Sequence, residues 1–234
     1  MTSPDSLLGK IKNTKPDSPE RQNIADSISH DLVTAWLNNP SWKIRNIGVK
    51  IIGELRLSEF TEILAKIVTD RTPAKLIDRM LGGDYYQVGF IRRNAAYALG
   101  CMDTAAENVT SALLEASQDR YWEVRAEAFN AMRRLYVKNV PPEILDTVSQ
   151  ALQDKSFEVV AQAVCTLGAL ATRENVVNNL RKTYDHPNII VKTVVVETLK
   201  KLHERGVIKD KAELSSELKN IFIPGIYFLI NNKK

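Results

Sequence analysis

The sequence predicts an all-α fold, a right-handed α-solenoid (superhelix) of about five helix pairs. The main evidence is a pattern with apolar or small residues at positions 1, 5, 9 and 12 and usually a basic residue at position 2. These offsets keep the four positions on one face of an α-helix. The five copies begin at Ile44, Ile91, Val124, Val159 and Val191, at intervals of 47, 33, 35 and 32 residues. A helical unit that returns at this period is typical of a solenoid, and the low aromatic content of 7% suits helix-pair packing.

The first 22 residues are predicted to be a mobile N-terminal lead-in. They contain Pro4, Pro16 and Pro19 and show no lasting apolar periodicity, and a single helical turn around Leu7 to Ile11 would be marginal alone. The solenoid is therefore expected over residues 23–219.

Each predicted pair has a first helix, a break and a second helix that carries the pattern. Pro40 lies in the first break, where it disfavours a continuous helix, and Ser58 and Pro142 suit the starts of two first helices. The expected helices cover residues 26–37 and 42–55, then 58–68 and the copy at Ile91, then a helix that begins near residue 108 and one over 122–136, then 142–152 and 157–171, then a helix with Val176, Val177 and Leu180 and one over 189–202, and finally 211–219.

The longest interval contains an insertion at residues 70–89. Residues 73–81 are predicted to form a short extra helix that Gly82 and Gly83 end. Insertions in solenoids often lie on the binding face, and tyrosines often anchor interfaces. Tyr85 and Tyr86 are therefore candidate contacts of the insertion, with packing against neighbouring helices as the alternative.

The basic residue at position 2 is predicted to belong to a structural ladder. An acidic or amide residue precedes several copies by five residues, where its side chain can cap the second helix or meet the basic residue of a neighbouring repeat. Val160 replaces the basic residue in the fourth copy, which interrupts the ladder there. The ladder residues are Arg45, Arg92, Arg125, Lys192, Asp119 and Asp154.

The pattern Asp-x-x-x-x-Val-Arg-x-x-Ala-x-x-x-Leu-Gly, best seen at residues 119–128 and 91–100, resembles a known family. It is similar to HEAT repeats of the short bacterial type, also called phycobilisome-lyase HEAT-like repeats. The resemblance covers about residues 24–205 and implies an armadillo-like helical fold whose second helices line the concave side. It specifies fold more than function, because such repeats serve scaffolds, adaptors and a few enzymes.

Positions 3, 4, 7 and 11 of the copies are expected to face out of the core, toward that concave groove. They mix amides, a tyrosine and both signs of charge, which suits a protein or peptide partner better than a polyanion. An unused solvated face is the alternative. The candidate groove residues are Lys50, Asn94, Tyr97, Glu127, Asn130, Arg134, Gln162, Glu197 and Lys201.

Composition argues against several other functions. The net charge of +4 lacks the clustered excess typical of a nucleic-acid surface. No histidine shares a helix face with another histidine or cysteine at ligand spacing, so no metal and no cofactor is expected. No catalytic motif is present, although a general acid–base pair of Glu127 and Glu197 stays open.

Residues 220–234 are predicted to be an apolar C-terminal cap or interface segment. The run at 221–230 is too short to span a bilayer, but the last repeat of a solenoid needs a cover. The run is expected to fold back on the last helix, to form a homodimer with a second copy, or to meet the remainder of a longer protein. Without a secretory signal at the N-terminus, a cytoplasmic location is expected.

The function expected from these observations is that of a non-enzymatic adaptor or scaffold that binds a protein or peptide partner through its concave groove. The family resemblance implies an alternative, a bilin lyase-like subunit that acts on phycobilisome antenna proteins. A third hypothesis is a HEAT-like protein that binds alkylated DNA. That function would need a basic concave stripe, which Glu54, Glu127 and Glu197 interrupt.

Overall fold

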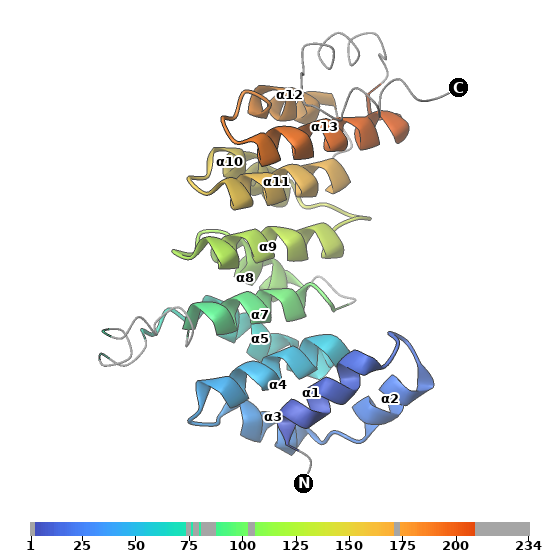
Figure 1. The fold of residues 1–234 in the computed structure, drawn as a ribbon, viewed down its shortest axis with the longest axis vertical. Helices are drawn as coiled ribbons and strands as arrows, with labels where there is room; N and C mark the ends of the chain where they lie inside the picture. The colour runs from blue at the N-terminus through green and yellow to red at the C-terminus, as the bar shows by residue number, and fades with distance from the viewer. Residues whose placement is uncertain are drawn as a thin grey trace. The chain divides into compact units, whose positions relative to one another are not determined.

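A computed structural model describes residues 3–73, 76, 80, 88–102, 106–170 and 174–208 (Figure 1). Within these residues every regular element is a helix. The chain divides into two compact units, Met1–Asn139 and Val140–Lys234.

The first unit contains three helix pairs. They are α3 (His30–Leu37) with α4 (Trp42–Leu55), α5 (Thr61–Thr69, after the 3₁₀ turn η1 at Ser58–Phe60) with α7 (Phe90–Leu99), and α8 (Glu107–Ala116) with α9 (Trp122–Leu135). In Figure 1 the second helices α4, α7 and α9 form one layer, and α5 and α8 lie behind them. Within the layer, α7 packs on both α4 and α9.

The second unit contains two further pairs. They are α10 (Pro142–Gln150, followed by the 3₁₀ turn η3 at Ala151–Gln153) with α11 (Phe157–Leu170), and α12 (Glu174–Thr183) with α13 (Ile189–Glu204). The two second helices, α11 and α13, again pack on each other. The fold is thus the all-α solenoid that the recurring pattern predicts, with five helix pairs among the described residues.

The recurring pattern marks the buried face of the second helices. Gly48 at position 5 lets α4 lie close to α3, because a Cβ on Gly48 would be 3.1 Å from the Cβ of Trp36. The residues at positions 5 and 9 are all buried: Gly48, Ala95, Ala128, Ala163 and Val195, and Ile52, Leu99, Met132, Leu167 and Leu199.

Position 10 brings successive second helices into close approach. It is glycine in three copies. A Cβ on Gly53 would lie 2.9 Å from the Cα of Ala98 in α7, and a Cβ on Gly100 would lie 2.7 Å from the Cα of Ala131 in α9. A Cβ on Gly168 of the second unit would collide with the side chain of Thr198. Only glycine allows the backbones to approach this closely.

The N-terminal residues differ from the lead-in expected over residues 1–22. They form two helices, α1 (Pro4–Asn13) and α2 (Pro19–Asp26), each with a proline in its first turn and a serine N-cap. α1 packs on α4, and Ile11 is fully buried. Tertiary packing of its apolar side therefore stabilises a helix whose isolated turns would be marginal.

One helix boundary also differs from the sequence-based expectation, and two predicted segments are not covered. The helix expected over residues 26–37 begins instead at His30, because the Oγ of Ser29 accepts the main-chain N–H of Leu32 at 3.2 Å. Most of the insertion, with Tyr85 and Tyr86, lies outside the described residues, as do residues 209–234 with the expected last helix and C-terminal segment. Those expectations stay predictions.

The close approach at position 10 makes a testable prediction. Gly100→Ala should lower the free energy of unfolding by about 1–3 kcal/mol, because α7 and α9 must separate to admit the methyl group. Gly9→Ala is the matched control, since a Cβ there has no neighbour within 4 Å, and it should stabilise α1 by about 0.5–1 kcal/mol. Urea unfolding followed by circular dichroism measures both. Equal shifts of the same sign would contradict the close approach.

Candidate partner-binding surface

The candidate surface of the first unit lies on the outward side of α4, α7 and α9. Five of the residues proposed from the sequence lie there, and each is half-buried: Lys50, Tyr97, Glu127, Asn130 and Arg134. Positions 4, 7 and 11 of neighbouring second helices therefore contribute to one face of this unit.

Arg134 is the centre of a polar network on this face. Its Nη2 lies 2.5 Å from Oε1 of Glu127, its guanidinium carbon lies 4.8 Å from the centre of the Tyr97 ring, and its Nη1 donates to Sγ of Cys101 at 3.6 Å. Nδ2 of Asn130 donates to the same Glu127 oxygen at 3.0 Å. The network therefore joins the end of α7 to α9.

Burial shifts the ionisation of three groups in this network. It raises the pKa of Tyr97 to about 12, with smaller contributions in the same direction from Cys101 and Glu54 and an opposing one from Arg134. Burial also raises the pKa of Cys101 and of Glu127, and Arg134 opposes both shifts. Tyr97 and Cys101 are therefore protonated at neutral pH, and neither is an activated nucleophile.

Next to this network lies a cationic patch, defined by Lys12, Lys50, Phe90 and Arg93. The Nζ of Lys50 lies 5.2 Å from the centre of the Phe90 ring, and the guanidinium carbon of Arg93 lies 5.9 Å from it. Burial lowers the pKa of Lys50, and the positive charges of Lys12 and Arg93 lower it further. The patch combines residues of α1, α4 and α7.

Asn94 does not face a groove, in contrast to the sequence-based expectation. It is buried, and its Nδ2 donates to Oδ1 of the equally buried Asn46 at 2.6 Å. Position 4 of α7 thus meets position 3 of α4 at the contact between two second helices. Asn94 holds these helices together and offers no surface to a partner.

The candidate residues of the second unit lie on α11 and α13. Glu197 and Lys201 are exposed, and Gln162 is half-buried. The main-chain oxygen of Gln162 accepts the Thr166 hydroxyl at 2.8 Å, while its Nε2 is buried and has no hydrogen-bond partner among the described residues. None of these three side chains makes an ion pair with another described residue.

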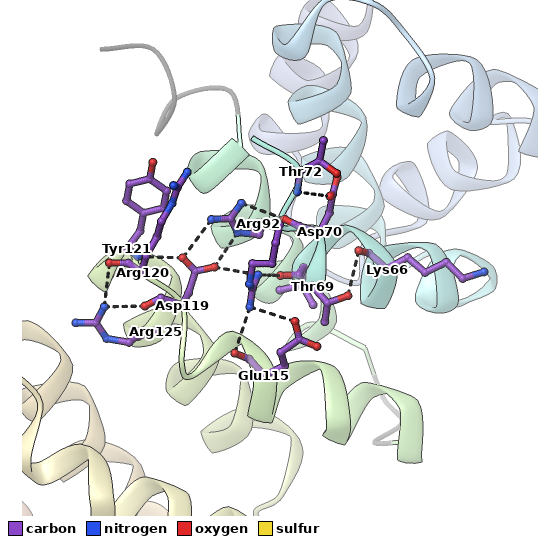
Figure 2. Close-up of polar contacts among 12 residues, drawn as sticks. Lys66, Thr69, Asp70, Thr72, Arg92, Glu115, Asp119, Arg120, Tyr121 and Arg125 are labelled. Carbon is purple, nitrogen blue, oxygen red and sulfur yellow. Dashed lines mark hydrogen bonds and ion pairs between the residues drawn. The ribbon is translucent and has the colours of Figure 1, made fainter. Parts of the chain in front are cut away.

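The ladder residue Asp119 lies in a buried ionic network at the turn before α9 (Figure 2). Its two carboxylate oxygens accept from Nε and Nη2 of Arg92, at 2.7 and 3.1 Å. Nη1 of Arg71 lies 3.0 Å from Oδ2, and the main-chain N–H of Tyr121 donates to Oδ1 at 2.9 Å. Arg92 belongs to the second pair and Asp119 to the third, so the contact joins two repeats.

The arginines at position 2 also brace the turns of their own repeats. Arg45 donates from Nη1 to two preceding main-chain oxygens at 2.8 and 2.9 Å, and Arg125 does the same at 2.8 and 3.3 Å. Arg92 donates to the main-chain oxygen of Asp70 at 3.1 Å. In the second unit Lys192 instead lies 5.3 Å from the centre of the Tyr184 ring.

The acidic and amide side chains of the turns accept a hydrogen bond from the main-chain N–H two residues later. Asn39, Asp119 and Asp154 accept the N–H of residue i+2 at 2.9, 2.9 and 2.8 Å, just before the second helix starts. Asp70 and Asn188 make the same contact, both at 2.8 Å. Sequence reasoning missed these two because it measured fixed distances from the pattern, and the insertion separates Asp70 from its own copy. For Asp70 the available signal was an Asx residue right after a first helix, and for Asn188 it was an Asx residue right before a second helix.

The Asp119 network predicts a large stability effect. Asp119→Asn should lower the free energy of unfolding by about 3–5 kcal/mol, because Arg92 is only 2% exposed and would lose its counter-charge. Glu62→Gln is the control, since it removes a carboxylate from the exposed pair with Lys66 and should leave the urea midpoint almost unchanged. A similar midpoint for both variants would show that the buried pair contributes no more than the exposed one.

The Glu127–Arg134 pair predicts a pH-dependent effect. Since burial raises the pKa of Glu127 in the folded state, its charged form costs stability, and this cost disappears as the pH falls through that pKa. Arg134→Ala should remove the compensation and lower stability by about 1–3 kcal/mol at neutral pH, and by less at mildly acidic pH. Glu127→Gln should restore most of the loss. Urea unfolding of both single variants and the double variant tests this, and strict additivity would exclude the coupling.

The rest of the described chain adds two observations. Its helices are all too short or too polar to cross a membrane. Within the described ranges, no three histidine, cysteine, aspartate or glutamate side chains come together in a way that could hold a metal ion.

Comparisons with known proteins found a family model and a solved structure that are similar to this chain. Residues 110–200 match a model of HEAT repeats. The crystal structure of an engineered protein is similar in fold, with a TM-score of 0.55 and 14% sequence identity over 90% of this chain and 100% of that chain. No curated protein sequence matches the chain. The match supports the resemblance to HEAT repeats but does not distinguish the short bacterial type, and the engineered protein shows that a similar fold occurs with a very different sequence.

Proposed function

We propose that the chain is a HEAT-like adaptor or scaffold that binds a protein or peptide partner through the outward face of its second helices. The observation that carries this proposal is the half-buried surface of α4, α7 and α9. There an aromatic ring, an arginine and an amide form one network at Tyr97, Arg134 and Asn130. Tyrosine and arginine are the side chains that most often dominate binding energy at protein interfaces.

The ionisation of the network supports binding over catalysis. Tyr97 and Cys101 have raised pKa values, so both keep their protons at neutral pH. The one carboxylate of the network, Glu127, is held by Arg134 and Asn130, which both donate to its Oε1. Such a network is suited to contact a partner by hydrogen bonds and stacking.

The bilin lyase-like and DNA-binding hypotheses rank below this proposal. The cationic patch would favour nucleic acid if it extended along the face, but Glu54 and Glu127 interrupt the positive charge there. A polyanion would meet both carboxylates, whereas a folded or extended polypeptide can match charges of both signs.

Site-specific photo-crosslinking tests the proposal. A benzoylphenylalanine at position 97 should form discrete cross-linked products in an extract of the native source, because a ring there lies within the proposed contact. The same residue at position 111 is the control, since Ser111 is exposed on α8, a first helix. Identical products from both positions, or products from position 111 alone, would place the binding surface elsewhere. After a partner is identified, Tyr97→Ala should weaken its binding by about 1–2 kcal/mol.

A further inference from the structure

The cationic patch concentrates positive charge around one aromatic ring. The Phe90 ring lies near both Lys50 and Arg93, and Lys12 adds a third cation from α1. Phe90, Lys50 and Arg93 are each half-buried, so the fold partly dehydrates these cations. An aromatic face stabilises a cation only modestly at exposed sites. The ring therefore does not replace a counter-ion.

The carboxylates next to the patch already form ion pairs with other arginines. Glu54 lies 2.6 Å from Nη2 of Arg21, and Glu127 lies 2.5 Å from Nη2 of Arg134. Among the ion pairs of the described residues, none involves Lys12, Lys50 or Arg93. The patch therefore carries positive charge that its neighbours on the described surface do not balance.

Lys50 also imposes a cost on the folded state. Its pKa is lowered, first by burial and then by Lys12 and Arg93, which means that the fold disfavours its charged form. A neutral side chain at position 50 would avoid this cost while keeping the contact with Phe90. Residues that reduce stability in this way are frequent where a surface is built for binding.

We infer that the cationic patch binds an acidic segment of a protein partner, whose carboxylates accept hydrogen bonds from Lys12, Lys50 and Arg93 while its aliphatic carbons cover the Phe90 ring. The inference rests on the proposed function and names the chemistry of the partner at that surface. Charge-assisted hydrogen bonds to carboxylates are short and strong, and they supply the counter-charge that the described neighbours of the patch do not provide. A nucleic-acid backbone is normally contacted at many phosphates. The patch has only three cations, and the negative charge of Glu127 lies close to one of them, Arg93. The patch is therefore too small to favour nucleic acid.

Fluorescence anisotropy with the full chain tests this inference. The probe is a labelled peptide of alternating Glu and Ala, about 12 residues long, in buffer of about 50 mM salt, where surface electrostatics are only partly screened. A matched peptide with Gln in place of every Glu is the control for peptide shape. We expect saturable binding of the Glu peptide and binding of the Gln peptide that is weaker by about tenfold or more. Equal binding of the two peptides would overturn the inference.

Two matched variants locate the binding. Lys50→Gln and Arg93→Gln should each weaken the Glu peptide by about two- to fivefold, as expected for partly exposed ion pairs. Lys66→Gln removes the same charge from an exposed side chain on α5 and should leave the affinity unchanged. A Lys66→Gln effect as large as that of Lys50→Gln would show attraction to net charge alone and would overturn the inference.

The melting temperature separates a binding role of Lys50 from a structural one. Lys50→Gln should leave it equal to or above that of the parent chain, because the variant removes a charge that burial disfavours. Weaker peptide binding together with a lower melting temperature would indicate a structural role instead. A labelled oligo-dT that binds more tightly than the Glu peptide, and loses affinity in Lys50→Gln, would assign the patch to nucleic acid and overturn the inference.

The proposed function and this inference fail in different ways. A partner that cross-links at position 97 but binds equally well to the Lys50→Gln chain would contradict the acidic-segment inference alone. A Glu peptide that binds in a Lys50-dependent manner, in a chain that yields no partner at position 97, would contradict the Tyr97 surface and leave the cationic patch as the binding site.

Discussion

The spacing between successive second helices depends on the absence of a side chain at position 10 of the repeat. A Cβ on Gly100 would meet the Cα of Ala131 at 2.7 Å and Nε of Arg134 at 3.3 Å. The second distance is as important as the first. Because Gly100 leaves this volume empty, the guanidinium group can cross from α9 to the end of α7, where it stacks on Tyr97 and donates to Cys101. Helix spacing and the chemistry of the exposed face therefore have one cause.

The sequence predicted the second helices well because their periodicity is a direct consequence of burial. Positions 5 and 9 repeat without exception as buried residues. The same reasoning was wrong for Asn94, since periodicity separates a helix into a buried and an outward side but does not show where a neighbouring helix covers the outward side. The amide of Asn46 lies there, and no pattern within one helix reveals it. α1 was missed for a similar reason, since its stability comes from α4.

Charges in this protein fall into two groups that the sequence does not distinguish. Asp119 and Arg92 are almost fully buried, and each compensates the other with two hydrogen bonds, so their role is to join repeats. Lys50 on α4 and Arg93, which directly follows Arg92 on α7, instead have cations and a ring as neighbours. The difference follows from the direction in which each side chain leaves its helix. Arg92 at position 2 of α7 points to the turn of the next repeat, whereas Arg93 at position 3 of α7 and Lys50 at position 7 of α4 lie on the outward face.

The packing of α1 on α4 has a consequence for how a ligand and the N-terminus influence each other. Lys12 is the last basic residue of α1, and its charge acts on Lys50. Any occupant that neutralises both lysines removes the repulsion between them and so strengthens the attachment of α1 to α4. By thermodynamic reciprocity, a chain in which α1 is detached binds the same occupant less tightly. The packing of α1 on α4 and the affinity for such an occupant would then be one coupled equilibrium.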